Sequence, residues 1–133
     1  THNYQNAAMA FAVGYLLKIP TEIITQALLT FPGLAHRQEI VGRYQDIVFV
    51  NDSKATNADA ASYALESYKE HPIYWIVGGL PKSQGIKPLE AYFPFIKHAF
   101  LIGKAQRDFA ETLEGKTPYT YSEDLQTALQ QAI

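Results

Sequence analysis

The chain has 133 residues, of which 47% are apolar and 18% are charged, and its net charge is −2 at pH 7. This composition suits one globular domain, or one domain plus a fragment, and argues against disorder. Because there is no basic block, the electrostatic footprint of a nucleic-acid-binding protein is missing. No apolar run is long enough to span a membrane. A chain without cysteine cannot form disulfides or thiolate sites, which fits a reducing cytosol.

Two amphipathic helices are predicted at the start of the chain. Apolar residues recur at helical spacing over residues 4–17, and a second helix restarts after Pro20 and runs to residue 31. Pro32-Gly33 then ends the helical pattern. We expect residues 1–35 to be a helical pair from a preceding domain. Since the sequence also opens without methionine, we expect it to be a piece of something longer.

Strands and helices alternate over residues 36–133. The expected strands are 39–44, 47–50, 73–77, 99–102 and 118–121, and the expected helices cover 58–68, 89–93, 105–113 and the residues after Ser122. The first two strands should form an antiparallel pair around a tight turn at Gln45-Asp46. Pro94 should cut the helix before it, and Ser122 should cap the last helix. The order predicts an α/β domain with a mostly parallel sheet flanked by helices.

The segment Asn51-Asp52-Ser53-Lys54-Ala55-Thr56-Asn57 carries most of the chemical signal. It joins a buried strand to a helix, so an acid, an ammonium group and two hydroxyls crowd one turn. Ligands of open α/β sheets bind outside the carboxyl ends of strands. Polar groups and a cation at a helix N-terminus suit an anionic ligand. The same residues can also be ordinary turn and capping residues, with Thr56 or Asn57 as the helix cap.

A second signal is the sequence Gly78-Gly79-x-x-Lys82-Ser83, which follows a predicted strand. Two glycines can end a strand and let the backbone approach a ligand closely, where the ammonium group of Lys82 could meet a carboxylate. The alternative is a solvated loop lysine. This sequence is not a Walker A loop, and the chain contains no such loop. The four histidines show no metal-binding spacing, so we expect no metal ligand in the chain.

Four motifs, in this order along the chain, resemble the Mur ligases, in the version that adds D-glutamate to UDP-N-acetylmuramoyl-L-alanine. They are His2-Asn3-x-x-Asn6, Gly33-Leu34-x-His36-Arg37-x-Glu39, the segment from Asn51 to Asn57, and Gly78-Gly79-x-x-Lys82-Ser83. The third motif is informative about the substrate, because other Mur ligases carry a Tyr-Gly-His or Tyr-Ala-His type sequence there. Many relatives have an acid where this chain has Pro81, from which we expect a stiffer loop and no lost charge contact.

The resemblance implies a division of the chain and a role for each motif. Residues 1–35 would be the last helices of the central ATP-binding domain, and residues 36–133 a Rossmann-like C-terminal domain, truncated before a further strand and a Ser-Pro-Ala type loop. The D-glutamate-binding residues would be Thr56, Lys82 and Ser83. The nucleotide-binding residues would be Asn3 and Asn6 at adenine, Arg37 from the domain linker, and Asp52 near the ribose. Lys54 would face the nucleotide phosphates or the acyl-phosphate as a catalytic residue.

These nucleotide contacts compete with simpler interpretations, since Asn3 can be a helix cap and Arg37 a surface charge. The implied reaction is an ATP-dependent ligation in peptidoglycan precursor synthesis, in which the amine of D-glutamate attacks an acyl-phosphate. ATP and Mg²⁺ would be bound mainly by the absent central domain, so the isolated chain should be inactive. The whole enzyme should be a cytoplasmic monomer without nucleic-acid or membrane partners.

A stand-alone Rossmann-like module that binds a nucleotide or an anion for regulation is the alternative from a different class. A flavodoxin-like receiver fits less well, because receivers lack a Gly-Gly turn and begin with a strand. The longer coding sequence would discriminate, since an upstream Gly-Lys-Thr/Ser loop favours the ligase.

Overall fold

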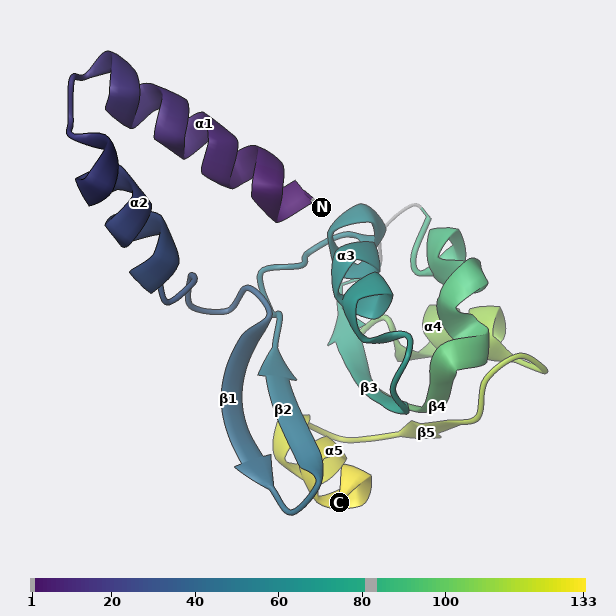
Figure 1. Cartoon of the computed structure of the whole chain (residues 1–133). Coiled ribbons are helices and arrows are strands. Elements are labelled where there is room, and N and C mark those ends of the chain that lie inside the picture. Colours follow the sequence, from purple (N-terminus) through teal and green to yellow (C-terminus); the bar gives the residue numbers. More distant parts are fainter. Residues whose placement is uncertain (1, 81–83) are drawn as a thin grey trace. The chain divides into compact units, whose positions relative to one another are not determined.

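The computed structural model describes residues 2–80 and 84–133, which form two compact units, Thr1–Ala35 and His36–Ile133 (Figure 1). The first unit is a helical pair, as the sequence predicts: α1 (His2–Leu16) and α2 (Thr21–Thr30). The two helices meet where Gly14 faces Ile24, since a Cβ added at Gly14 would lie 2.9 Å from Cδ1 of Ile24. A small residue therefore permits the close approach of the helices at this point.

The second unit begins with an antiparallel hairpin. Strands β1 (Glu39–Tyr44) and β2 (Ile47–Asn51) pair from Glu39 opposite Asn51 to Tyr44 opposite Ile47. Gln45 has a φ of 50° in the connecting turn, and such a left-handed residue lets a two-residue loop reverse the chain. Both the pair and its turn match the sequence prediction. The hairpin ends with Asn51 at the start of the signal-rich segment.

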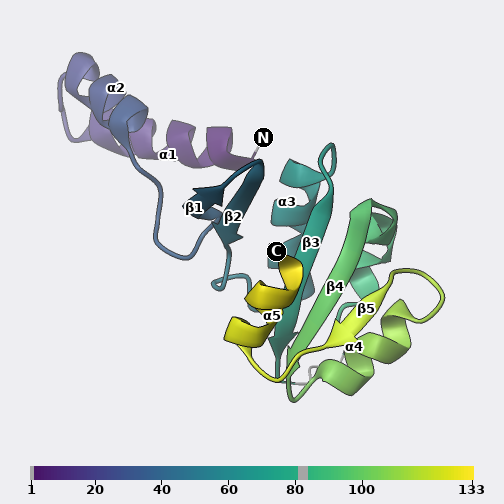
Figure 2. The same cartoon turned by 90° about the horizontal axis from the view of Figure 1, so that it is seen from below.

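A three-stranded parallel sheet forms the centre of the second unit. Its strands β3 (Ile73–Gly79), β4 (Ile96–Gly103) and β5 (Tyr119–Tyr121) lie in the order β3-β4-β5 (Figure 2). The α/β class and the parallel sheet flanked by helices are confirmed.

One aspect of the sheet differs from the sequence prediction. The sequence predicts one mostly parallel sheet, whereas β2 pairs with β1 in a separate two-stranded sheet within the described residues. The reason is local, because a two-residue turn brings β1 and β2 together before any long-range pairing is needed. Apolar runs predict strands but do not specify the neighbour of each strand.

Helices cover both faces of the parallel sheet. Helix α3 (Ala58–Tyr68), the 3₁₀ helix η1 (Lys87–Phe95) and α4 (Gln106–Leu113) enclose the core on one face, and α5 (Leu125–Ala132) contacts β3 and β4 from the other face (Figure 2). The core is apolar, and its least exposed members are Leu89, Phe93, Ala99, Leu101, Ala105 and Leu113. Of the described residues, no helix has both the length and the apolarity of a membrane span.

The helix caps settle one open question and correct one prediction. Asn57 caps α3, because its side-chain oxygen accepts a hydrogen bond of 2.8 Å from the N–H of Ala60. Asp124, not Ser122, caps α5 and accepts from the N–H of Thr127, which lowers the pKa of its carboxyl group. Ser122 was wrongly predicted as the cap because its hydroxyl is buried and donates to Gln131 instead.

Glycines allow the carboxyl ends of β3 and β4 to touch backbone to backbone. A Cβ at Gly78 would overlap the carbonyl oxygen of Ile102, and one at Gly103 would lie 3.1 Å from the backbone N and O of Gly79. Gly79 and Gly103 also have φ angles of 133° and 76°, which side chains rarely adopt. Gly78 is therefore needed for packing, whereas the sequence suggested access for a ligand.

Replacing Gly78 with alanine should lower the free energy of unfolding by about 2–3 kcal/mol, because the added methyl group forces two strand ends apart. Urea unfolding, followed through the fluorescence of Trp75, which packs against the core, measures this loss. Gly42→Ala is the matched control, since a Cβ there meets no atom within 4 Å and its φ is not left-handed. Equal midpoints for the two variants would contradict the packing role of Gly78.

Candidate functional site

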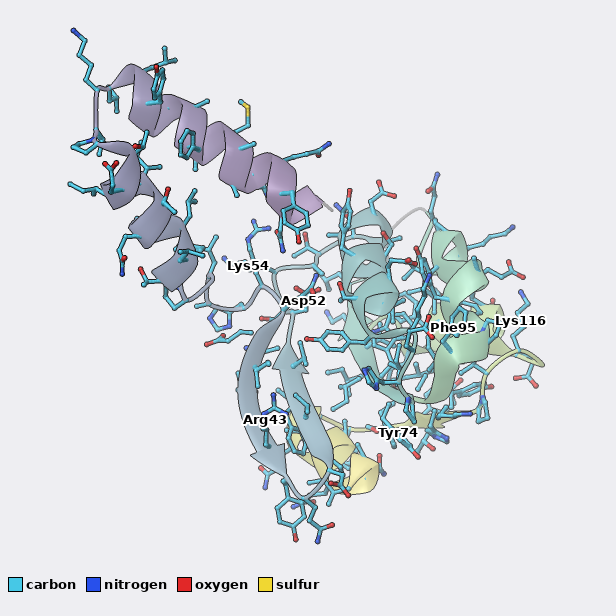
Figure 3. The ribbon with its side chains drawn as sticks, in the orientation of Figure 1. Arg43, Asp52, Lys54, Tyr74, Phe95 and Lys116 are labelled. Atoms are coloured by element: carbon cyan, nitrogen blue, oxygen red, sulfur yellow. The ribbon has the colours of Figure 1, made fainter. Side chains whose placement is uncertain are left out.

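The loop Asn51–Asn57 between β2 and α3 is a compact double turn. The N–H of Ala55 donates to the carbonyl of Asp52 at 2.8 Å, and the N–H of Thr56 donates to the carbonyl of Lys54 at 2.9 Å. Asp52 and Lys54 thus lie on the turn directly after β2 (Figure 3), and the Asn57 cap starts the helix. Three of the predicted site residues, Asp52, Lys54 and Thr56, are therefore held on one short segment.

A second segment, His36–Gln38, is hydrogen-bonded to this loop. The carbonyl of His36 accepts from the N–H of Lys54 at 3.0 Å, and the N–H of Gln38 donates to Oδ1 of Asp52 at 3.0 Å. The side chains of Asn51 and His36 also meet, with 2.9 Å between Nδ2 and Nδ1. Because Arg37 lies between His36 and Gln38, these bonds bring it to the loop that carries Asp52 and Lys54.

The two cations of this assembly are available to an anion. Arg37 and Lys54 are exposed, and neither has an ion-pair partner among residues 2–80 and 84–133. Asp52 is half-buried and uses one carboxylate oxygen to hold Gln38. Guanidinium and ammonium groups suit phosphate and carboxylate oxygens, and the hydroxyl of exposed Thr56 adds a further polar group. The arrangement can bind an anion but offers no nucleophile of its own.

Two other polar side-chain pairs lie outside this loop. The hydroxyl of Tyr119 donates to Oε2 of Glu114 at 2.7 Å, and this bond raises the pKa of Tyr119 to about 12. Lys116 bonds Oε1 of Glu90 at 2.7 Å and lowers the pKa of that carboxyl group. Both pairs are exposed and fasten surface elements together, so they do not mark a catalytic centre.

Four further residues were predicted for the site: Lys82, Ser83, Asn3 and Asn6. Lys82 and Ser83 fall outside the described residues, although the strand end that precedes them, Gly78-Gly79, is exposed. Asn3 and Asn6 are exposed on α1, and their spacing of three places them on one face of that helix. Within the second unit, the structure therefore brings Arg37 together with Asp52, Lys54 and Thr56.

The described residues contain no metal centre. No three histidine, aspartate or glutamate side chains converge to hold an ion over residues 2–80 and 84–133. The sequence contains no phosphate-cradling Walker A loop either. The donor set thus does not fit a Mg²⁺ site within this part of the molecule, and a nucleotide could meet only isolated polar and cationic groups.

A polar hollow lies on the face of the sheet that α5 partly covers. It is lined by Tyr74, Lys97, His98, Phe100, Thr120 and Gln131. Nε2 of His98 and Oγ1 of Thr120 are 2.8 Å apart, so these two groups satisfy one another. Tyr74 and His98 stand in the amino-terminal halves of their strands. Ligands of α/β sheets bind at the carboxyl ends instead.

Three residues that organise the loop had no assigned role from the sequence alone: His36, Gln38 and Asn51. His36 and Asn51 stand inside the motifs, but the contact between them joins positions fifteen apart. The available signal was the side chain of Asn51 at a strand end, since asparagine commonly bonds the backbone two residues later. Here the N–H of Ser53 does donate to Oδ1 of Asn51 at 3.1 Å.

Comparison with known proteins agrees with these motifs. Residues 36–133 match the family model described as "Mur ligase, glutamate ligase domain". Proteins named UDP-N-acetylmuramoylalanine--D-glutamate ligase are 54% identical in Nitrobacter winogradskyi, 51% in Caulobacter sp. (strain K31) and 51% in Rhizobium etli. These matches cover 96%, 96% and 99% of this chain, but only 27%, 27% and 28% of the relatives.

The chain thus spans about a quarter of the length of the curated relatives that it matches. The matched segment includes the hairpin, the loop after β2 and the whole parallel sheet. The extent of this match shows that the chain belongs to the Mur ligase family, with a glutamate ligase domain over residues 36–133.

Proposed function

We propose that this chain is the C-terminal part of an ATP-dependent ligase that adds D-glutamate to UDP-N-acetylmuramoyl-L-alanine in peptidoglycan precursor synthesis. The observation that carries the proposal is the hydrogen-bonded junction of His36–Gln38 with the loop after β2, which gathers Arg37, Asp52, Lys54 and Thr56. The names of relatives that share half of the residues support the choice of D-glutamate as the added amino acid.

In this proposal the domain holds D-glutamate by its two carboxylates. The hydroxyl of Thr56 and the groups of Lys82 and Ser83 are the partners, supplied from the ends of two strands. A charge-assisted hydrogen bond contributes about 1.5–3 kcal/mol, so a few such contacts give a usable but modest affinity. Selection of one enantiomer needs at least three fixed contacts. The backbone contact between β3 and β4 holds Gly78 and Gly79, which precede Lys82 in the sequence, in a fixed position.

The nucleotide contacts in the proposal are Arg37, Asp52, Asn3 and Asn6. Asp52 would accept from a ribose hydroxyl through the oxygen that Gln38 leaves open, and Arg37 would pair with phosphate oxygens. The amides of Asn3 and Asn6 each offer a donor and an acceptor, which suits an adenine edge. Lys54 would attract the developing negative charge of the acyl-phosphate, and its exposure leaves it free to do so.

The chemistry of phosphate transfer would come from the rest of the ligase. Residues 1–35 would be the last helices of its central domain, which would bind ATP and Mg²⁺. The residues of the present chain would bind and orient D-glutamate, so that its amine meets the activated carboxyl carbon. The ligase would act in the cytoplasm as a monomer, with small molecules as its partners.

Lys82→Ala in the full-length ligase should raise the KM for D-glutamate about ten- to a hundredfold, because a charge-assisted contact to a carboxylate is lost. The KM for ATP should change much less. Steady-state kinetics with each substrate varied in turn measures both values. Lys97→Ala, at an exposed lysine on β4, is the matched control for the loss of a surface charge. An unchanged D-glutamate KM in a folded Lys82→Ala protein would show a solvated loop lysine.

Thr56→Val should also raise the KM for D-glutamate, by about tenfold, because the hydrogen bond from its hydroxyl to a carboxylate is lost. Thr56→Ser keeps the hydroxyl and should retain most of the affinity, which separates the hydrogen bond from the shape of the side chain. Circular dichroism of both variants checks that α3, capped by the neighbouring Asn57, is intact. Equal KM values for the serine and valine variants would remove Thr56 from the D-glutamate site.

The isolated 133-residue chain should release no phosphate from ATP above background, with or without D-glutamate, because it has no Walker A loop. A coupled phosphate assay across the fractions of a final gel-filtration step measures this. The full-length ligase, assayed in parallel, is the positive control. Turnover that follows the chain through the column would mean that other residues hold the triphosphate.

A further inference from the structure

We propose that Asn51 is a positioning residue: its side-chain amide fastens the His36–Gln38 segment to the loop after β2 and thereby sets where Arg37 stands relative to Asp52. This inference rests on the proposed function of the site but concerns a residue that does not itself touch substrate. Asn51 is half-buried at the end of β2, between the two segments that it joins.

The hydrogen bonds assign the orientation of the Asn51 amide. The N–H of Ser53 can only donate, so the atom of Asn51 that it meets at 3.1 Å is the oxygen. The amide nitrogen must then face Nδ1 of His36, 2.9 Å away. Since an amide nitrogen only donates, Nδ1 of His36 must be the acceptor. This contact therefore requires the tautomer of His36 that carries its proton on Nε2.

The rest of the junction cannot replace this contact. The bond from the N–H of Lys54 to the carbonyl of His36 and the bond from the N–H of Gln38 to Asp52 hold the two backbones together. They leave the ring of His36 unconstrained. The N–H of His36 donates to Oε2 of Glu39, which holds only its backbone. The Asn51 amide is thus the group that fixes the side chain adjacent to Arg37.

The backbone conformation of residues 36–38 makes the contact between Asn51 and His36 important. His36 and Gln38 have φ angles of 64° and 48°, in the left-handed region that side chains rarely adopt. Arg37 therefore lies between two residues in conformations that their surroundings must maintain. Loss of the Asn51 contact should let the segment sample other conformations, and Arg37 would be misplaced without any loss of the core.

Kinetics of the full-length ligase test the proposal. Asn51→Ala removes the bonds to His36 and from Ser53 and should raise the KM for ATP about three- to tenfold, with less change in the KM for D-glutamate. Thr117→Val is the control, because it removes one buried bond, from Oγ1 to the carbonyl of Phe93, before β5 begins. It should leave both KM values unchanged. The same rise in both variants, or none in Asn51→Ala, would overturn the positioning role.

Variants at His36 test whether the contact itself matters. His36→Gly removes the ring but tolerates the left-handed φ, so its effect cannot be ascribed to strain. His36→Asn also tolerates that conformation and places an oxygen near the position of Nδ1, so it should restore the KM for ATP. The double variant Asn51→Ala/His36→Gly should be no worse than either single variant. Additive effects would mean that the two residues act separately.

A spectroscopic readout separates this proposal from the proposed function. In full-length ligase labelled with ¹⁵N-histidine, the signals lost in His36→Asn identify His36, and they should report an unprotonated Nδ1 with the proton on Nε2. In Asn51→Ala the signals of His36 should report a mixture of the two tautomers. If the wild-type protein shows no ligase activity but this pattern appears, the proposed function fails and the contact stands. A proton on Nδ1 of the wild type would reject the positioning role.

Discussion

The polar part of this domain depends on one junction, at which the segment 36–38 is hydrogen-bonded to the turn after β2. Three hydrogen bonds cross the junction: from the N–H of Lys54 to His36, from the N–H of Gln38 to Asp52, and between the side chains of His36 and Asn51. A fourth, from the N–H of Ser53 to Asn51, lies within the turn. Each net contribution is modest, about 0.5–1.5 kcal/mol. Their combined effect is geometric, because they place a guanidinium group, a carboxylate and an ammonium group on one assembly without any ion pair among them.

A second constraint is steric and lies at the ends of the strands. Gly78, Gly79 and Gly103 let β3 and β4 finish in direct backbone contact, and the N–H of Ala105 donates to the carbonyl of Gly79 at 3.1 Å. A loop that starts from such a junction has a fixed origin, and ligand groups are most precise when rigid elements support them. The same feature explains why a glycine pair that resembles a ligand-binding motif is also required by packing.

Much of the fold could be predicted from the sequence, because apolar periodicity and Pro or Gly breaks specify most helices and strands locally. The loop Asn51–Asn57 was predicted for the same reason, because its charged and hydroxyl side chains directly follow the apolar pattern of a strand. The prediction that Pro94 ends its helix was wrong, because Pro94 lies inside η1, which runs to Phe95. The neighbour of each strand within a sheet was not predictable. In the described residues β2 pairs with β1 alone. The cap at Asp124 was missed because burial of Ser122 depends on tertiary packing. The contact of His36 with Asn51 was missed because it joins side chains distant in sequence.

The exposure of Arg37 and Lys54 has a consequence for how such a domain works. With a net charge of −2, the chain as a whole does not attract anions, so Arg37 and Lys54 can act only locally on an anion that reaches this loop. Exposed charges interact weakly, since water and salt screen them, and the same contacts strengthen when water is excluded. A domain built in this way can leave its cations solvated at little cost before substrates bind. Affinity for an anion should then arise mainly when the surroundings of this loop exclude water.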